Sequence, residues 1–332
     1  MNGSFDLTFA FSLQPIVYSL LPMIVKTQAI VLRIIPFSET SCVVLWLTTD
    51  HGKIATIIKG ARRRRSPFVG QVDLFYTCEL LVYLRLFRGL HIVKECSPLK
   101  TRAPLRSRWR ATACASYFTD LAAQISPLYA PHPELFHVLD MALDYFADQS
   151  ALELGLFWFE LKLMKAMGLS PQLKECLLCH RPLQVGPSQL SVGSGQSGRA
   201  TADATRSASV FSCARGGVLC RACAQSAPIP TSSSRDGVGV PIAPDILGIL
   251  RFWQASRSWR SAQSAACTPR QTKELERIMG FFMQYHLEIG NPARAVALSI
   301  LRTRIALASK TDRDSPRRHG NTEMKKDEIL SN

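Results

Sequence analysis

Two Cys-x-x-Cys pairs constrain the fold of this chain more than any other feature: Cys176 with Cys179, and Cys220 with Cys223. The two residues between the thiolates of a pair let both sulfurs contact one ion at about 2.3 Å, and two such pairs complete a tetrahedral site. The chain must therefore fold back across the 40 residues that separate Cys179 from Cys220. We predict a structural Zn²⁺ ion held by these four cysteines, with free or redox-active thiols as the alternative.

Two further residues near the pairs are rival ligands. His180 directly follows Cys179 and would have difficulty joining the same pair, and Cys213 has no pair partner. Four thiolates leave no open coordination position, which predicts a structural role for the ion.

Between the pairs lies a Ser/Gly-rich insert, 186–209, which we expect to be mobile and to lengthen the loop at little extra entropic cost.

The first 25 residues and the number of cysteines together indicate the cellular compartment of the protein. The apolar stretch 9–25 is interrupted by Gln14, Pro15 and Pro22 and has no basic segment before it, so it fits neither a signal peptide nor a membrane span. Ten cysteines without a convincing secretory signal favour a reducing compartment, and we predict a cytoplasmic protein. Met23 is a candidate for the true start.

Five short strand-like runs, rich in Val, Ile, Leu and aromatic residues, lie between Lys26 and Cys96. Turn residues separate these runs, whose centres are 29–34, 42–47, 53–59, 78–84 and 90–95. Five strands in so short a segment predict a small β-barrel, of which the nucleic-acid-binding OB-fold is one common form.

Helical periodicity replaces the strand pattern after this segment. Apolar residues recur at helical core-face spacing between Leu135 and Phe146 and again between Leu275 and Phe282. The predicted fold class is therefore α+β and multi-domain, with an N-terminal OB-fold β-barrel followed by a mainly helical domain with an inserted four-cysteine zinc finger. The predicted division is an extension, disordered or from a misassigned start (1–22), the OB-fold domain (23–100), the first helical part (101–170), the zinc-finger insertion (171–225), a linker (226–242), the second helical part (243–308) and a disordered charged tail (309–332).

The charge distribution predicts where a polyanion binds. The chain has a formal net charge of +15, and residues 23–110 hold 16 Lys and Arg against 5 Asp and Glu, whereas residues 111–170 hold 2 against 7. Such a balance favours nucleic acid as the partner, and a run of four arginines begins at Arg62, just after the third strand-like run and Gly60. The predicted nucleic-acid-binding residues are Arg33, Lys53, Lys59, Arg62, Arg63, Arg64 and Arg65. Phe68 or Phe75 would stack a base if exposed, although aromatic residues at such positions more often belong to a core.

Enzyme motifs are absent from the sequence. There is no phosphate-binding glycine loop and no Gly-x-Ser-x-Gly elbow, so we predict no catalytic residues and no enzyme. His132-Pro-Glu134 with Cys176-x-x-Cys179 imitates the motif of zinc nucleobase deaminases, but Glu175 stands where those enzymes have Pro, and two cysteines stay unexplained.

The order and spacing of several motifs resemble those of the bacterial RecO family of recombination mediators over roughly residues 24–305. The matching segments are Ala29-Ile-Val-Leu-Arg33, Phe37-Ser-Glu-Thr-Ser41, Leu47-Thr-Thr-Asp-His-Gly52, Lys59-Gly-Ala-Arg62, Leu156-Phe-Trp-Phe-Glu-Leu-Lys-Leu-Met164, Gly168-Leu-Ser-Pro171, Cys176-x-x-Cys179 and Gly216-Gly-Val-Leu-Cys220 with Cys223. The first 22 residues and the Ser-rich insert lie outside the resemblance.

This resemblance implies a non-enzymatic role in DNA repair. It implies binding of single- and double-stranded DNA, annealing of complementary strands, and action with RecR to help RecA load onto DNA coated by single-strand-binding protein. It also implies that an apolar, basic-rimmed groove of the helical domain, for which Arg294 and its neighbours are candidates, receives the acidic C-terminal tail of single-strand-binding protein. The alternative is a zinc-ribbon RNA-binding or transcription accessory protein.

Overall fold

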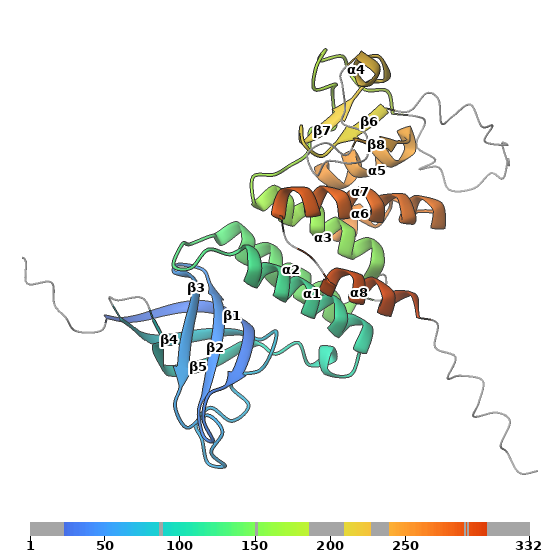
Figure 1. Cartoon of the computed structure of the whole chain (residues 1–332). Helices are drawn as coiled ribbons and strands as arrows, with labels where there is room; N and C mark the ends of the chain where they lie inside the picture. The colour runs from blue at the N-terminus through green and yellow to red at the C-terminus, as the bar shows by residue number, and fades with distance from the viewer. Residues whose placement is uncertain are drawn as a thin grey trace, which may run out of the picture.

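A five-stranded barrel lies at one end of the molecule, a small cysteine-containing module lies at the other, and a body of helices separates them (Figure 1). The computed structural model describes residues 23–85, 89–149, 152–185, 209–226, 239–288, 290 and 292–303. The predicted extension 1–22, almost all of the Ser/Gly-rich insert, the predicted tail 309–332 and much of the predicted linker lie outside these residues. No helix within them is long and apolar enough to cross a membrane.

The barrel is closed and has the strand order β1-β2-β3-β5-β4. Its strands are β1 (Met23–Pro36), β2 (Cys42–Thr48), β3 (Gly52–Ile58), β4 (Thr77–Leu84) and β5 (His91–Lys100). The long β1 closes the barrel because it pairs with β2 through its second half and with β4 through its first half. A short parallel pairing of β3 with β5 completes the ring, so the predicted OB-type barrel is confirmed.

The interior of the barrel is filled from alternate positions along the strands. Along β3, Ile54, Thr56 and Ile58 are fully buried while the residues between them are partly exposed, which is the period-2 pattern of a strand with one core face. The buried indole of Trp46 donates from Nε1 to Thr56 Oγ1 at 2.7 Å. Both polar groups are thereby satisfied inside the barrel.

Among the residues that the structure describes, the helical body contains a short 3₁₀ helix and seven α-helices. They are η1 (Ala103–Arg106), α1 (Trp109–Ile125), α2 (Pro133–Asp148), α3 (Leu152–Ala166), α5 (Pro244–Ala255), α6 (Trp259–Ala262), α7 (Pro269–Leu287) and α8 (Pro292–Arg302). The core faces predicted on α2 and α7 are buried, and α3 is buried almost all round, as its apolar sequence indicates.

The cysteine module contains the three-stranded sheet β7-β6-β8 and the short helix α4 (Arg221–Ser226). Its strands are β6 (Ser209–Ser212), β7 (Gly217–Leu219) and β8 (Gly239–Ile242). β8 lies inside the segment that the sequence predicts as a linker. The sequence pattern does not reveal this strand, because four residues, two of them buried, are too few to show the alternation of a strand. The module docks on α7 through an edge-on contact between the rings of Phe211 and Phe282 at 5.4 Å.

Candidate nucleic-acid interface and metal centre

The connection from β3 to β4 presents a cluster of cations, Lys59 and Arg62–Arg65, which we call the arginine loop. Gly60 adopts φ +69° and so turns the chain out of β3. Backbone hydrogen bonds from Arg63 N to Gly60 O at 3.1 Å and from Ser66 N to Arg63 O at 3.0 Å then give the loop a defined path. All five cationic side chains are exposed. Across the residues that the structure describes, none of the five forms an ion pair, so their charge faces solvent.

The structure does not bring the other two predicted cations to this loop. Arg33 Nη2 lies 3.0 Å from Asp120 Oδ1 of α1, and its side chain is about half exposed. Lys53 Nζ donates to the carbonyl of Ala123, also on α1, at 2.5 Å, and burial lowers the pKa of this amine. Both side chains thus hold the barrel against the helical body. Sequence reasoning misses these contacts because their partners lie 87 and 70 residues further along the chain.

The two aromatic residues considered for base stacking are not free to stack. Phe75, at φ +68°, is 8% exposed and belongs to the core shared with the helices. Phe68 is half-buried and packs on the barrel interior. The core interpretation of these residues therefore fits the structure.

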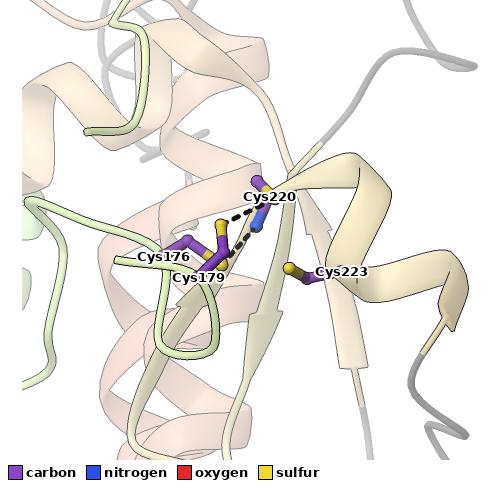
Figure 2. Close-up of side chains that lie close together, drawn as sticks. All are labelled: Cys176, Cys179, Cys220 and Cys223. Atoms are coloured by element: carbon purple, nitrogen blue, oxygen red, sulfur yellow. Dashed lines mark hydrogen bonds between the residues drawn. The ribbon is translucent and has the colours of Figure 1, made fainter. Parts of the chain in front are cut away.

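The four paired cysteines converge on one point at the edge of the cysteine module. Their sulfur atoms all lie within 4.8 Å of one another. Cys176 and Cys179 come from the loop after α3, while Cys220 and Cys223 come from the end of β7 and from α4 (Figure 2). The sulfurs of Cys179 and Cys220 are 3.7 Å apart, and Cys220 N donates to Cys176 Sγ at 3.3 Å.

This geometry fits a tetrahedral metal ion with a closed thiolate set. Burial raises the pKa of Cys176, but hydrogen bonds from the backbone amides of Cys179, Cys220 and Leu178 outweigh burial and lower the pKa to about 6. Those donors therefore favour the thiolate that a metal needs. A sharp turn at Gly216, with φ +69°, returns the chain from β6 to β7 and so delivers the second pair.

The rival ligands lie outside the cluster. His180 is exposed, and its Nδ1 lies 3.5 Å from Glu175 Oε1. Cys213 is buried in the apolar core, where burial raises the pKa of its thiol to about 11. His132 caps α2 by accepting a hydrogen bond from Leu135 N at 3.3 Å, so it serves as a helix cap rather than as the metal ligand that a deaminase requires.

A groove of about 500 Å³ lies between α7 and α8. Apolar side chains such as Phe281 and Met283 share its lining with the cations Lys273, Arg277 and Arg294. The side chain of Arg294 is only 11% exposed, since it points into the helical body, where its Nε lies 2.7 Å from Oε1 of the fully buried Glu160.

Comparison with known proteins connects these features to one family. The family model "Recombination protein O C terminal" matches residues 106–295, and "Recombination protein O N terminal" matches residues 23–102. The chain belongs to the RecO family. The N-terminal match ends with β5 and so covers the barrel, while the C-terminal match covers the helices through the start of α8 and the cysteine module.

Relatives named DNA repair protein RecO support the assignment over most of the chain. The relative from Anaeromyxobacter sp. (strain K) is 28% identical over 263 residues, which cover 79% of this chain and 91% of the relative. The relative from Syntrophus aciditrophicus (strain SB) is 29% identical over 225 residues, covering 68% and 73%. The relative from Bacillus pumilus (strain SAFR-032) is 29% identical over 159 residues, covering 47% and 60%.

Proposed function

We propose that this protein is a non-catalytic, DNA-binding recombination mediator that acts in DNA repair, in a RecF-type pathway. In this role it binds single- and double-stranded DNA, anneals complementary strands, and helps RecA load onto DNA coated by single-strand-binding protein. The observation that carries the proposal is the exposed arginine loop on a closed OB-type barrel in a chain of the RecO family.

The arginine loop supplies the chemistry for phosphate binding. Guanidinium groups donate paired hydrogen bonds to phosphate oxygens and keep their charge at any physiological pH. Their contact with the backbone releases condensed counterions, which favours binding at low salt. Because two complementary strands repel each other through their phosphates, a surface that neutralises both backbones lets them approach and pair.

We assign partners from the family and from the surfaces. The groove between α7 and α8 combines apolar lining with Lys273 and Arg277, which suits the acidic C-terminal tail of single-strand-binding protein. Glu276 also lines the groove, so the tail's carboxylates would lie toward the two cations. RecR is the proposed second protein partner, and the proposed location is the bacterial cytoplasm in association with the nucleoid.

We infer that the four-cysteine cluster holds Zn²⁺. A set of four thiolates suits this soft, tetrahedral ion and leaves no position for substrate or water, so the ion would stabilise the module and take no part in a reaction. Cys176, Cys179, Cys220 and Cys223 would be the ligands. Function would then rest on the cationic barrel and the groove.

A strand-annealing assay at several salt concentrations tests the proposal. The wild-type protein should accelerate annealing of complementary DNA. The variant with Arg62–Arg65 replaced by Gln should bind DNA more weakly, and the slope of its log affinity against log salt concentration should be smaller by up to about four, one for each lost charge. The matched control replaces four exposed cations by Gln: Lys174 and Arg181 of the loop that carries Cys176, and Arg257 and Arg260 of the helical part. This control removes the same net charge and should retain annealing.

An RNA competitor separates the proposal from its alternative. Tight RNA binding without annealing of DNA would favour the zinc-ribbon RNA-binding or transcription accessory protein. Equal salt dependence in wild-type protein and in the arginine-loop variant would remove this loop from the DNA-binding surface.

A further inference from the structure

An exposed aromatic ring lies beside the arginine loop, in the turn that joins β1 to β2. Phe37 is 61% exposed, although phenylalanine is normally buried. The turn that carries Phe37 is well defined, because Phe37 N donates to Ser41 O at 3.0 Å and Ser38 N donates to the same carbonyl at 3.2 Å. The ring is therefore held on an ordered turn in contact with solvent.

Hydrogen bonds join this turn to the arginine loop. Arg62 N donates to Thr40 O at 2.9 Å, and Gly60 N donates to Ser41 Oγ at 3.4 Å. The guanidinium of Arg62 reaches the carbonyl of Ser38, the neighbour of Phe37, at 3.3 Å. The turn and the loop thus form one surface, with an aromatic ring on one part and fixed positive charges on the other.

Other aromatic residues of the described barrel are not available in this way. Trp46, Phe75 and Tyr76 are at most 8% exposed, Phe68 packs on the barrel core, and Tyr83 is partly buried on β4, where it pairs with Ile92 of β5. Trp109, at the start of α1, is 46% exposed, but the guanidinium of Arg110 lies 5.4 Å from the centre of its ring. Phe37 therefore combines exposure with proximity to the cations of the arginine loop.

We propose that Phe37 is a base-stacking residue that binds an unpaired base of single-stranded DNA while the adjacent arginines bind the phosphates. An aromatic ring stacks on any base, because every base has a π-face, and this contact needs no particular sequence. The ring would select single strands, since the bases of a duplex are already stacked on one another. Glu39, in the same turn, is exposed and repels phosphate, which leaves the phosphates to the arginine side of the surface. The inference rests on the proposed DNA-binding function and assigns the part that distinguishes single from double strands.

The test compares Phe37→Ala, Phe37→Leu and Phe37→Trp with wild-type protein, using an oligothymidine that contains one 2-aminopurine and a duplex of equal length. Phe37→Ala should bind the single strand about tenfold more weakly, on the scale of a lost base stack, with an unchanged salt dependence because no charge is removed. Duplex binding should change less than twofold. Phe37→Leu should behave like Phe37→Ala, and Phe37→Trp should restore both affinity and the quenching of 2-aminopurine. Trp109→Ala, which removes an exposed aromatic ring at the start of α1, should match wild type.

The outcomes distinguish this inference from the proposed function. Wild-type affinity and quenching in Phe37→Ala, with weak binding by the arginine-loop variant, would overturn the stacking role and leave the DNA-binding function intact. If Phe37→Leu and the wild-type protein bind equally well, a simple apolar contact explains the binding, and the stacking role is overturned as well. Absence of DNA binding by wild-type protein would overturn both. If Phe37→Ala fails to fold, ultraviolet cross-linking of the wild-type protein to oligothymidine decides, since the inference requires a cross-linked peptide that contains Phe37.

Discussion

A buried ion pair joins α3 to α8 at the centre of the helical body. The carboxylate of Glu160 is fully buried, accepts a hydrogen bond from the hydroxyl of Tyr117 at 2.8 Å and pairs with Arg294 at 2.7 Å. Burial and the nearby carboxylate raise the pKa of Tyr117, so its hydroxyl keeps the proton that it donates. Such a group is stable only while every member is paired.

Replacing Arg294 by Met should therefore lower the free energy of unfolding by about 3–5 kcal/mol, because Glu160 would remain buried without its counter-ion. Urea denaturation measures this change. The triple variant Tyr117→Phe, Glu160→Leu, Arg294→Met should recover most of the loss, since it removes all three polar groups together. If the triple variant is no more stable than Arg294→Met, packing rather than the unpaired charge explains the effect.

Stability should fall in mild acid because of His91. This side chain is 2% exposed, its Nδ1 accepts a hydrogen bond from Arg85 N at 3.1 Å, and burial, together with the positive charges of Arg85 and His51, lowers its pKa below the ordinary value of 6.5. Below pH 6.5 the imidazole of His91 binds a proton in the unfolded chain, whereas burial opposes its protonation in the folded chain. The contribution to stability is therefore complete above pH 6.5 and is lost as pH falls through the lowered pKa.

The slope should reach at most about 1.4 kcal/mol per pH unit for this group. His91→Asn, whose side-chain oxygen can still accept from Arg85 N, should flatten the profile of unfolding free energy between pH 6.5 and pH 5. His286, whose pKa burial also lowers, is unchanged in both proteins and supplies the residual slope. Identical slopes for the variant and the wild type would contradict the assignment to His91.

At the scale of elements, the cysteine module should depend on its metal. The strands of this module have three or four residues each, and so few residues bury too little apolar surface to be stable on their own. Purified protein should contain one Zn²⁺ per chain, and Cys220→Ser should lose the ion together with amide protection in β6 and β7. His180→Ala, which changes the neighbour of a ligand, should keep both. Full zinc content and native melting of Cys220→Ser would refute the four-thiolate site.

The elements themselves were predictable where a local pattern carries the signal. The alternation of Ile54, Thr56 and Ile58 predicts a strand, and the spacing of each cysteine pair predicts a shared ion, because both depend on near neighbours. By contrast, Arg33 and Lys53 carry no local sign of their contacts with α1. Exposure of Phe37 is equally invisible in the sequence, since an apolar residue after a strand is usually buried.

At the scale of the whole molecule, a second polar cluster fixes the barrel to the helices. Arg102, which follows β5, is 7% exposed and pairs with Asp140 at 2.5 Å and Asp144 at 2.7 Å, both on α2. The same guanidinium donates to the carbonyl of Phe75 at 2.5 Å. Arginine suits this position because one planar group with five donors can satisfy several acceptors on both sides of the junction.

The β2–β3 turn forms the other side of this junction, and Gly52 is the residue that permits its close approach. Gly52 has φ +64°, and a Cβ atom at this position would lie 2.1 Å from the carbonyl oxygen of Ala130, in the loop between α1 and α2. Next to it, Tyr129 N donates to Lys53 O at 3.1 Å. A side chain on Gly52 would therefore separate the barrel from the helical body.

Gly52→Ala should destabilise the protein by about 2 kcal/mol more than Gly70→Ala does, because overpacking adds to the backbone strain. Gly70, at φ +74°, is the matched control: alanine there carries the same left-handed strain, but its Cβ would contact nothing within 4 Å. Urea denaturation gives the difference, and hydrogen exchange should show faster exchange at Tyr129 N in Gly52→Ala alone. DNA binding by the arginine loop should persist in Gly52→Ala, since that loop begins beyond the far end of β3. Equal destabilisation by the two alanines would mean that the close approach at Ala130 contributes nothing, and that the polar contacts of Arg33, Lys53 and Arg102 hold the junction.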